Sequence, residues 1–191
     1  MDSTGLCYVC QNASSHLAGM RSVSAHVAPL REAIHALKYN GMRVLAEPLG
    51  EILADYWRLA VFPPSVIVPV PLHEARLRQR GYNQSLLLAR SLAARVSLPV
   101  ESHALVRQRN TRCQVELSPA ERRTNVEGAF RCHPGTLAGE RVLLIDDVLT
   151  TGATLEACAS ALLEAGTKEV WALTLTRAVD GHPAVSDRDR I

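Results

Sequence analysis

The apolar positions of this chain follow two kinds of spacing, and the first kind predicts helices. Apolar residues separated by three or four positions over residues 45–57 lie on one side of a helix, and the prolines at 63–64 would end that helix. The same spacing predicts a helix over residues 83–96. A further helix is predicted over 152–165, with Gly166 as its C-terminal cap.

The second kind of spacing is a continuous apolar run, which is typical of buried strands. Residues 66–70 and 142–145 form such runs, 169–175 form a further strand candidate, and 99–105 a weaker one. Because strands alternate with helices, the sequence predicts an α/β fold, an open and mostly parallel twisted sheet with helices on both faces. Such sheets bind ligands beyond the carboxyl ends of their strands.

The polar stretches divide the chain into three parts. Residues 1–28 form a polar N-terminal segment, 29–179 the α/β domain, and 180–191 a polar tail that we expect to fray. Within the domain, residues 107–135 are polar, rich in arginine and longer than a normal connection, which favours a functional or mobile loop.

Composition narrows the class of protein. The chain has 191 residues, enough for one domain with a sizeable core. It contains no run of about 18 apolar residues, the length of a membrane span, and no apolar stretch after a basic N-terminus that would mark a signal peptide. Its five cysteines are unevenly spread, unlike a secreted disulfide framework, so we expect a reducing cytoplasm.

Charge is close to balanced overall but uneven along the chain. The formal net charge is +2, yet residues 73–131 hold eleven arginines against five glutamates. This local excess favours an anionic partner, either phosphates or nucleic acid, although any one of these arginines could equally be a solvated surface residue. The two lysines are Lys38 and Lys168.

The segment after the apolar run 142–145 carries the clearest chemistry. Asp146 and Asp147 come first, and residues 150–154 (Thr-Thr-Gly-Ala-Thr) then open the helix. Small residues, hydroxyls and a helix N-terminus together form a site for a phosphate dianion. Carboxylates repel phosphate but accept hydrogen bonds from two neighbouring hydroxyls, such as the 2′ and 3′ hydroxyls of ribose. The pattern therefore predicts a sugar-phosphate site.

Other motifs with an acidic pair fit less well. The magnesium-binding strand of nucleotide hydrolases requires a Gly-x-x-x-x-Gly-Lys loop elsewhere, and the sequence has no Gly-Lys dipeptide. It also has no Gly-x-Gly-x-x-Gly dinucleotide motif. The remaining alternative is an acidic helix cap after a buried strand.

Residues 142–154 resemble the phosphoribosyl pyrophosphate (PRPP) binding motif of type I phosphoribosyltransferases. The chain as a whole resembles the ComF family, which is linked to DNA uptake and use in bacteria. Four further stretches carry this resemblance in family order, within residues 30–177: 37–41, 68–71, 78–84 and 121–130.

The resemblance implies roles for named residues. Asp146 and Asp147 would contact the ribose hydroxyls. The 5-phosphate would be bound by Thr150, Thr151, Gly152, Ala153 and Thr154. Pyrophosphate, with a bound Mg²⁺, would meet Leu72, His73, Arg76, Arg78, Arg80 and Lys38. A flexible hood over residues 107–128 would exclude water during transfer and would supply Arg107, Arg109, Arg112 or Arg122.

The same resemblance implies a phosphoribosyltransferase that moves the phosphoribosyl group of PRPP to an unidentified acceptor and releases pyrophosphate, in a DNA-uptake context. Thr150 stands where purine-salvage members carry an acid, which argues against a purine acceptor. The alternative is a non-catalytic PRPP or nucleotide sensor that partners a DNA-uptake helicase or single-stranded DNA. Against direct strand binding, aromatic residues make up only 4% of the chain. The chain could also form a homodimer.

ComF-like proteins often begin with zinc knuckles, and here Cys7 and Cys10 form half of such a site. Two thiolates do not complete a tetrahedral Zn²⁺ site, and the spacing of His16 and His26 fits no standard pattern. We expect the other three cysteines to be loop or core residues. They are Cys113, Cys132 and Cys158.

Overall fold

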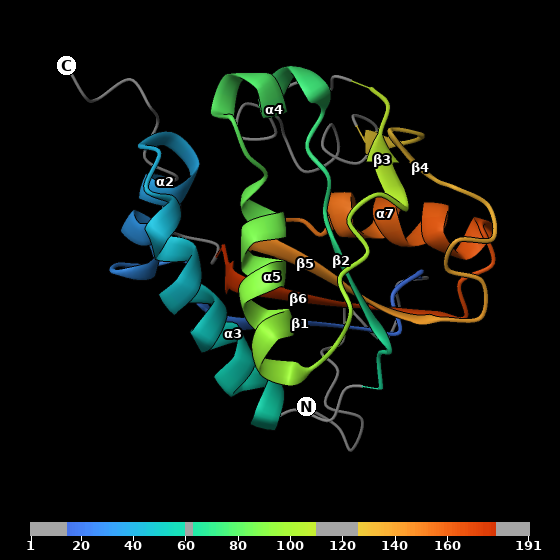
Figure 1. Cartoon of the computed structure of the whole chain (residues 1–191), viewed down its shortest axis with the longest axis horizontal. Helices are drawn as coiled ribbons and strands as arrows, with labels where there is room; N and C mark the ends of the chain where they lie inside the picture. The colour runs from blue at the N-terminus through green and yellow to red at the C-terminus, as the bar shows by residue number, and fades with distance from the viewer. Residues whose placement is uncertain (1–14, 60–62, 110–125, 179–191) are drawn as a thin grey trace.

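Four parallel strands form the central sheet in the computed structural model of the chain (Figure 1). The structure describes residues 15–59, 63–109 and 126–178. The strand order is β1 (Gly19–Ala25), β6 (Glu169–Arg177), β5 (Arg141–Leu149) and β2 (Val66–Pro69). Val100 extends the sheet by one parallel bridge to Ile67.

The apolar run predicted at 142–145 is the middle of β5, and β5 is an inner strand of the sheet. Leu144 lies opposite Val68 of β2 on one side and Ala172 of β6 on the other. All four residues of the run are fully buried. A strand with neighbours on both edges and layers on both faces has no polar side to present, which explains the unbroken apolar run.

Helices cover one face of the sheet (Figure 1). These are α2 (Leu30–Tyr39), α3 (Ala46–Leu59) and α5 (Gln84–Val96), with a 3₁₀ turn, η1 (Arg43–Leu45), leading into α3. Leu143 and Ile145 of β5 point to this side and pack in one core with Leu53 of α3 and Leu88 of α5.

A second core lies on the opposite face. Val142 and Leu144 pack there with α7 (Ala153–Glu164) and with a two-stranded antiparallel pair. The pair consists of β3 (Leu105–Arg107) and β4 (Phe130–Cys132), and a short helix, α4 (Glu74–Arg80), follows the end of β2. The predicted fold class, a parallel sheet with helices on both faces, is confirmed.

The long helices and inner strands begin and end within a few residues of their predicted bounds, but two expectations differ from the structure. Residues 99–105 contribute only the Val100 bridge and the first residue of β3. The strand β1 was not predicted, and it lies before residue 29, where the sequence suggested that the α/β domain begins. It is an edge strand with half-buried side chains and no apolar run, so the hydrophobic pattern gives no signal for it.

None of the helices in the described ranges is long and apolar enough to cross a membrane. The cysteine pair at positions 7 and 10 and the tail 180–191 lie outside those ranges.

Candidate functional site

Polar side chains gather where the parallel strands end. Asp146 and Asp147 occupy the last part of β5, and Thr176 lies near the end of the neighbouring β6. His26 directly follows β1. Because parallel strands share a direction, their carboxyl ends bring these residues to one edge of the sheet, where ligands bind in such folds.

Asp147 is a buried carboxylate with one paired oxygen. The residue is 3% exposed, and its Oδ1 lies 2.7 Å from Nζ of Lys38 on α2. Burial lowers the pKa of Lys38, but the Asp147 carboxylate outweighs this and leaves the pKa raised. Lys38 therefore stays charged. The second oxygen, Asp147 Oδ2, is buried and accepts no hydrogen bond from the described residues, which is unusual for a buried carboxylate oxygen.

Asp146 has different surroundings. Its Oδ1 accepts hydrogen bonds from the Ser85 hydroxyl and from the Asp147 amide, each at 2.9 Å. Burial raises the pKa of Asp146 to about 7, and the negative charge of Asp147 adds to the rise, while Lys38 and the two hydrogen bonds oppose it. The acidic pair thus combines a carboxylate held by a lysine with one that titrates near neutral pH.

His26 extends this cluster toward β1, the outermost strand on that side of the sheet. Its Nδ1 lies 2.7 Å from Oγ1 of Thr176. Burial and the nearby charge of Lys38 lower the pKa of His26, against a smaller opposing effect of Asp147. A neutral imidazole at this place adds no further positive charge to the site.

The loop after β5 has the geometry of an anion site. Gly152 adopts the left-handed conformation, with φ 81°, and is the N-cap of α7, a conformation that glycine adopts without strain. Thr151 Oγ1 accepts a hydrogen bond from the Ala153 amide at 3.4 Å. Thr150 and Thr151 are exposed. The exposed hydroxyls of Thr150 and Thr151 therefore lead into the N-terminus of a three-turn helix, three residues after the acidic pair in the sequence.

The residues assigned to pyrophosphate lie on the segment after β2. His73 is the N-cap of α4, and its Nδ1 accepts from the Ala75 amide at 3.2 Å. Arg78 pairs with Glu74 at 2.9 Å on the surface, and Arg80 donates to Gln84 at 2.5 Å. Leu72 and Arg76 are half-buried. Lys38 lies on α2, with its ammonium group on Asp147.

The predicted hood is described only at its base. Arg107 lies in β3, half-buried, with its guanidinium 5.3 Å from the centre of the Phe130 ring. Arg109 is exposed. Arg112 and Arg122 fall outside the described residues, as do Cys7 and Cys10. Within the described ranges no cluster of three His, Cys, Asp or Glu side chains could hold a metal ion.

Cys132 and Cys158 are buried free thiols. This placement agrees with the expectation that they are loop or core residues, while Cys113 lies outside the described ranges.

Sequence reasoning missed Ser85, His26 and Thr176. Ser85 stands in the first turn of a predicted helix, two residues after the Asn83 cap, and a hydroxyl there could have been flagged as facing the strand ends. His26 follows a strand with no apolar pattern, so no local signal marked it. Their contacts join residues that are 61 and 150 positions apart.

Comparisons with known proteins point to one family. The sequence profile of the phosphoribosyl transferase domain matches residues 83–189. DNA utilization protein YhgH of Escherichia coli O157:H7 is 35% identical over 162 residues, which cover 81% of this chain and 71% of that protein. Competence protein F of Haemophilus influenzae is 32% identical over 163 residues, which cover 82% of this chain and 71% of that protein. Among solved structures, glutamine PRPP amidotransferase from B. subtilis aligns with 68% of this chain and 25% of its own, at 24% identity and a TM-score of 0.46.

Proposed function

The chain belongs to the ComF family of type I phosphoribosyltransferases, and we propose that it binds PRPP at the end of β5. The observation that carries the proposal is one juxtaposition. Two adjacent carboxylates, one with a buried oxygen that has no donor among the described residues, stand directly before a threonine-rich helix N-terminus.

The two halves of the site would bind different parts of the ligand. Asp147 Oδ2 and the ionised Asp146 would accept hydrogen bonds from the ribose hydroxyls. The 5-phosphate would bind residues 150–154, where the helix N-terminus favours an anion. Lys38 keeps a positive charge beside the pair, which lowers the repulsion between two carboxylates and a highly charged ligand.

Pyrophosphate would lie on the side of the segment after β2, toward His73 and Arg76. Magnesium would enter this site as a companion of PRPP. When bound, Mg²⁺ would neutralise charge on the departing pyrophosphate. Substrate oxygens would be its main ligands, as is common for this ion.

The reaction would transfer the phosphoribosyl group to an acceptor and release pyrophosphate. The C1–oxygen bond to pyrophosphate breaks, and a new bond forms from C1 to the acceptor. The chain's own contribution would be to orient the ribose through Asp146 and Asp147 and to hold the 5-phosphate. Closure of the hood, with Arg107 and Arg109 at its base, would exclude water from the cationic sugar.

The names of the relatives support a process in which this binding would take part. Proteins called DNA utilization protein and competence protein support a role in DNA uptake or use, and we propose that this role is cytoplasmic. These names describe a process and no reaction, and they favour a second candidate, in which the chain binds PRPP or a nucleotide without turnover and signals to an uptake partner.

A pyrophosphate-release assay separates the two candidates. Wild-type protein is incubated with PRPP, Mg²⁺ and a panel of amines, bases and nucleotides, beside the double variant Asp146→Asn/Asp147→Asn. The exposed Asp55→Asn variant, which loses only a surface pair with Arg58, is the control. An enzyme gives Mg²⁺-dependent release that the double variant loses and the control keeps. Tight PRPP binding without release favours the non-catalytic candidate.

A further inference from the structure

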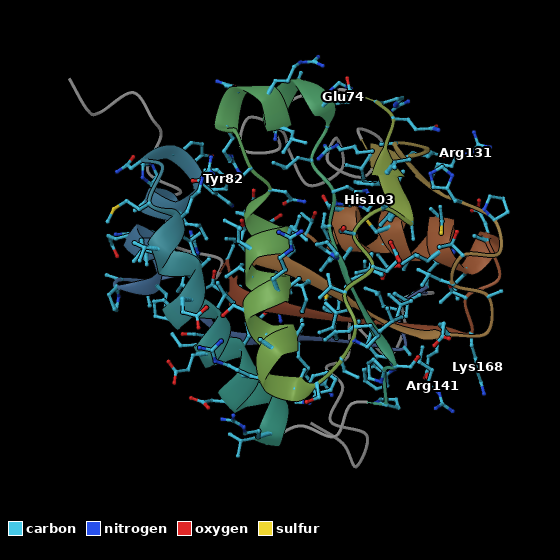
Figure 2. All side chains as sticks on the ribbon, viewed as in Figure 1. Glu74, Tyr82, His103, Arg131, Arg141 and Lys168 are labelled. Carbon is cyan, nitrogen blue, oxygen red and sulfur yellow. The ribbon has the colours of Figure 1, made fainter. Side chains whose placement is uncertain are left out.

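The short segment that joins α4 to α5, residues 80–85, includes the last residue of α4 and the first two residues of α5. It contacts Asp146 directly, and it contacts α2, the helix whose Lys38 pairs with Asp147. Figure 2 shows Tyr82 on this segment, on the side that faces α2. None of its contacts was expected from the PRPP motif, because the segment lies more than 60 positions before Asp146 in the sequence.

The first contact reaches the helix that carries Lys38. Tyr82 is 8% exposed, and its hydroxyl donates a hydrogen bond to the carbonyl of Leu37. The guanidinium of Arg80 lies 5.3 Å from the ring centre of Tyr39. The residues on either side of Lys38 are therefore both held by this segment. A lysine has four rotatable side-chain bonds, and fixing the backbone at its base limits where its ammonium group can lie.

The second contact reaches the acidic pair directly. Ser85 is fully buried, and its hydroxyl donates to Asp146 Oδ1 at 2.9 Å. This bond is one of the interactions that favour the ionised form of Asp146. A hydrogen bond to a carboxylate is stronger than one between neutral groups.

The segment is itself fixed to the sheet. The Asn83 side-chain amide donates to the Val70 carbonyl at the end of β2, at 3.0 Å. Its Oδ1 accepts from the Ser85 amide, also at 3.0 Å, and caps α5. The backbone that carries Tyr82 and Ser85 is therefore fixed to the end of the sheet at which Asp146 and Asp147 lie.

We propose that Tyr82 and Ser85 are positioning residues of the ribose site. Tyr82 fixes the last turn of α2 so that Lys38 meets Asp147, and Ser85 orients Asp146. The link to ligand rests on the proposed function, whereas the positioning of the two carboxylates does not.

Three substitutions that each remove one side-chain hydroxyl test these positioning roles. Tyr82→Phe and Ser85→Ala each remove one hydroxyl of the segment. Ser91→Ala is the matched control, since Ser91 is also buried on α5 and its hydroxyl also bonds to another helix, at Glu47. Carbon-13 NMR of the aspartate carboxyls in the free protein gives the titration midpoint of Asp146. The charged and titratable groups around this carboxyl are Asp147, Lys38 and Cys158, and all three stay intact in each variant.

We expect Ser85→Ala to move the midpoint upward by about one pH unit, because the ionised form loses a donor. Tyr82→Phe should give a smaller rise in the same direction as Lys38 becomes less confined. Ser91→Ala should leave the midpoint in place even where the melting temperature falls. An unmoved midpoint in Ser85→Ala or Tyr82→Phe overturns the role assigned to that residue, because loss of stability alone would not shift it.

Calorimetric titration with ribose 5-phosphate measures whether the same variants bind the ligand more weakly. We expect about fivefold weaker binding in Ser85→Ala, the effect of one hydrogen bond, and an unchanged affinity in Ser91→Ala. Equal affinity in Ser85→Ala and wild-type protein contradicts positioning of the ribose acceptor. If wild-type protein binds neither ribose 5-phosphate nor PRPP, the proposed function fails, while the NMR midpoints still decide the positioning roles.

Discussion

Asp146 and Asp147 are neighbours in sequence, yet the fold gives them different electrostatic surroundings. Asp147 forms an ion pair with Lys38 at 2.7 Å, whereas Asp146 has hydrogen-bond donors but no cation in direct contact within the described part of the chain. The sequence predicted that both accept ribose hydroxyls. It did not predict the asymmetry, because Lys38 and Ser85 are brought to the pair from distant helices.

The raised pKa of Asp146 makes the stability of the free protein depend on pH. Between its ordinary value of 3.8 and about 7, the folded protein holds a proton on Asp146 that the unfolded chain has released. Folding is therefore progressively destabilised as pH rises through this window. Asp146→Asn removes the titrating group, so its melting temperature relative to wild type should rise by a few degrees between pH 5 and pH 8. A constant difference, like that expected of Asp55→Asn, would contradict the raised pKa.

The ion pair of Lys38 is expected to stabilise the fold as well as the site. Lys38→Met leaves the Asp147 carboxylate buried without its partner and should cost about 3 kcal/mol in the free energy of unfolding, measured with urea. Adding Asp147→Asn should recover part of the loss, because the buried charge is gone. Lys168→Met is the control, since Lys168 is exposed. It should change stability by less than about 0.5 kcal/mol. Equal effects of the two lysine variants would argue against the pair.

At the scale of elements, the hydrophobic pattern predicted those helices and strands whose buried residues recur at regular intervals. The helices at 45–57, 83–96 and 152–165 and the central strand at 142–145 were found in this way. It missed β1 because an edge strand buries little. Gly19 of β1 packs against the Trp171 ring so closely that a Cβ would lie 2.3 Å from a ring atom. Such a contact is not visible in the sequence spacing.

The crossing of α3 and α5 depends on a second close contact. A Cβ on Gly50 would lie 2.2 Å from Oγ and 2.3 Å from Cβ of Ser91. Gly50→Ala should therefore separate the helices and lower stability by about 1–3 kcal/mol, despite the better helix propensity of alanine. Thermal or urea unfolding measures the effect.

A second substitution tests the cause. Ser91→Gly removes the atoms that the new methyl group meets, so the double variant should lose less stability than the two single losses add up to. Strict additivity would show that the Gly50–Ser91 contact does not limit the crossing.

At the scale of the whole molecule, the topology assembles the site. The motif at 142–154 is contiguous, so its carboxylates and phosphate-type loop could be located from the sequence. The remaining groups come from α2, α5, β6 and the residue that follows β1, and they meet only because the parallel strands end at one side of the sheet. Lys38 illustrates the difference: it was assigned to pyrophosphate by resemblance, and the fold places its ammonium group on Asp147. Local patterns identify a motif, while its electrostatic setting is a property of the tertiary structure.

Binding of PRPP tests the central claim most directly. Isothermal titration of the full chain with PRPP, with and without Mg²⁺, should show one site per chain and tighter binding with the ion. Asp146→Asn/Asp147→Asn should bind at least about tenfold more weakly, a loss of about 1.4 kcal/mol, and Asp55→Asn should match wild type. No binding of PRPP by wild-type protein, or equal binding by the double variant, would contradict the account.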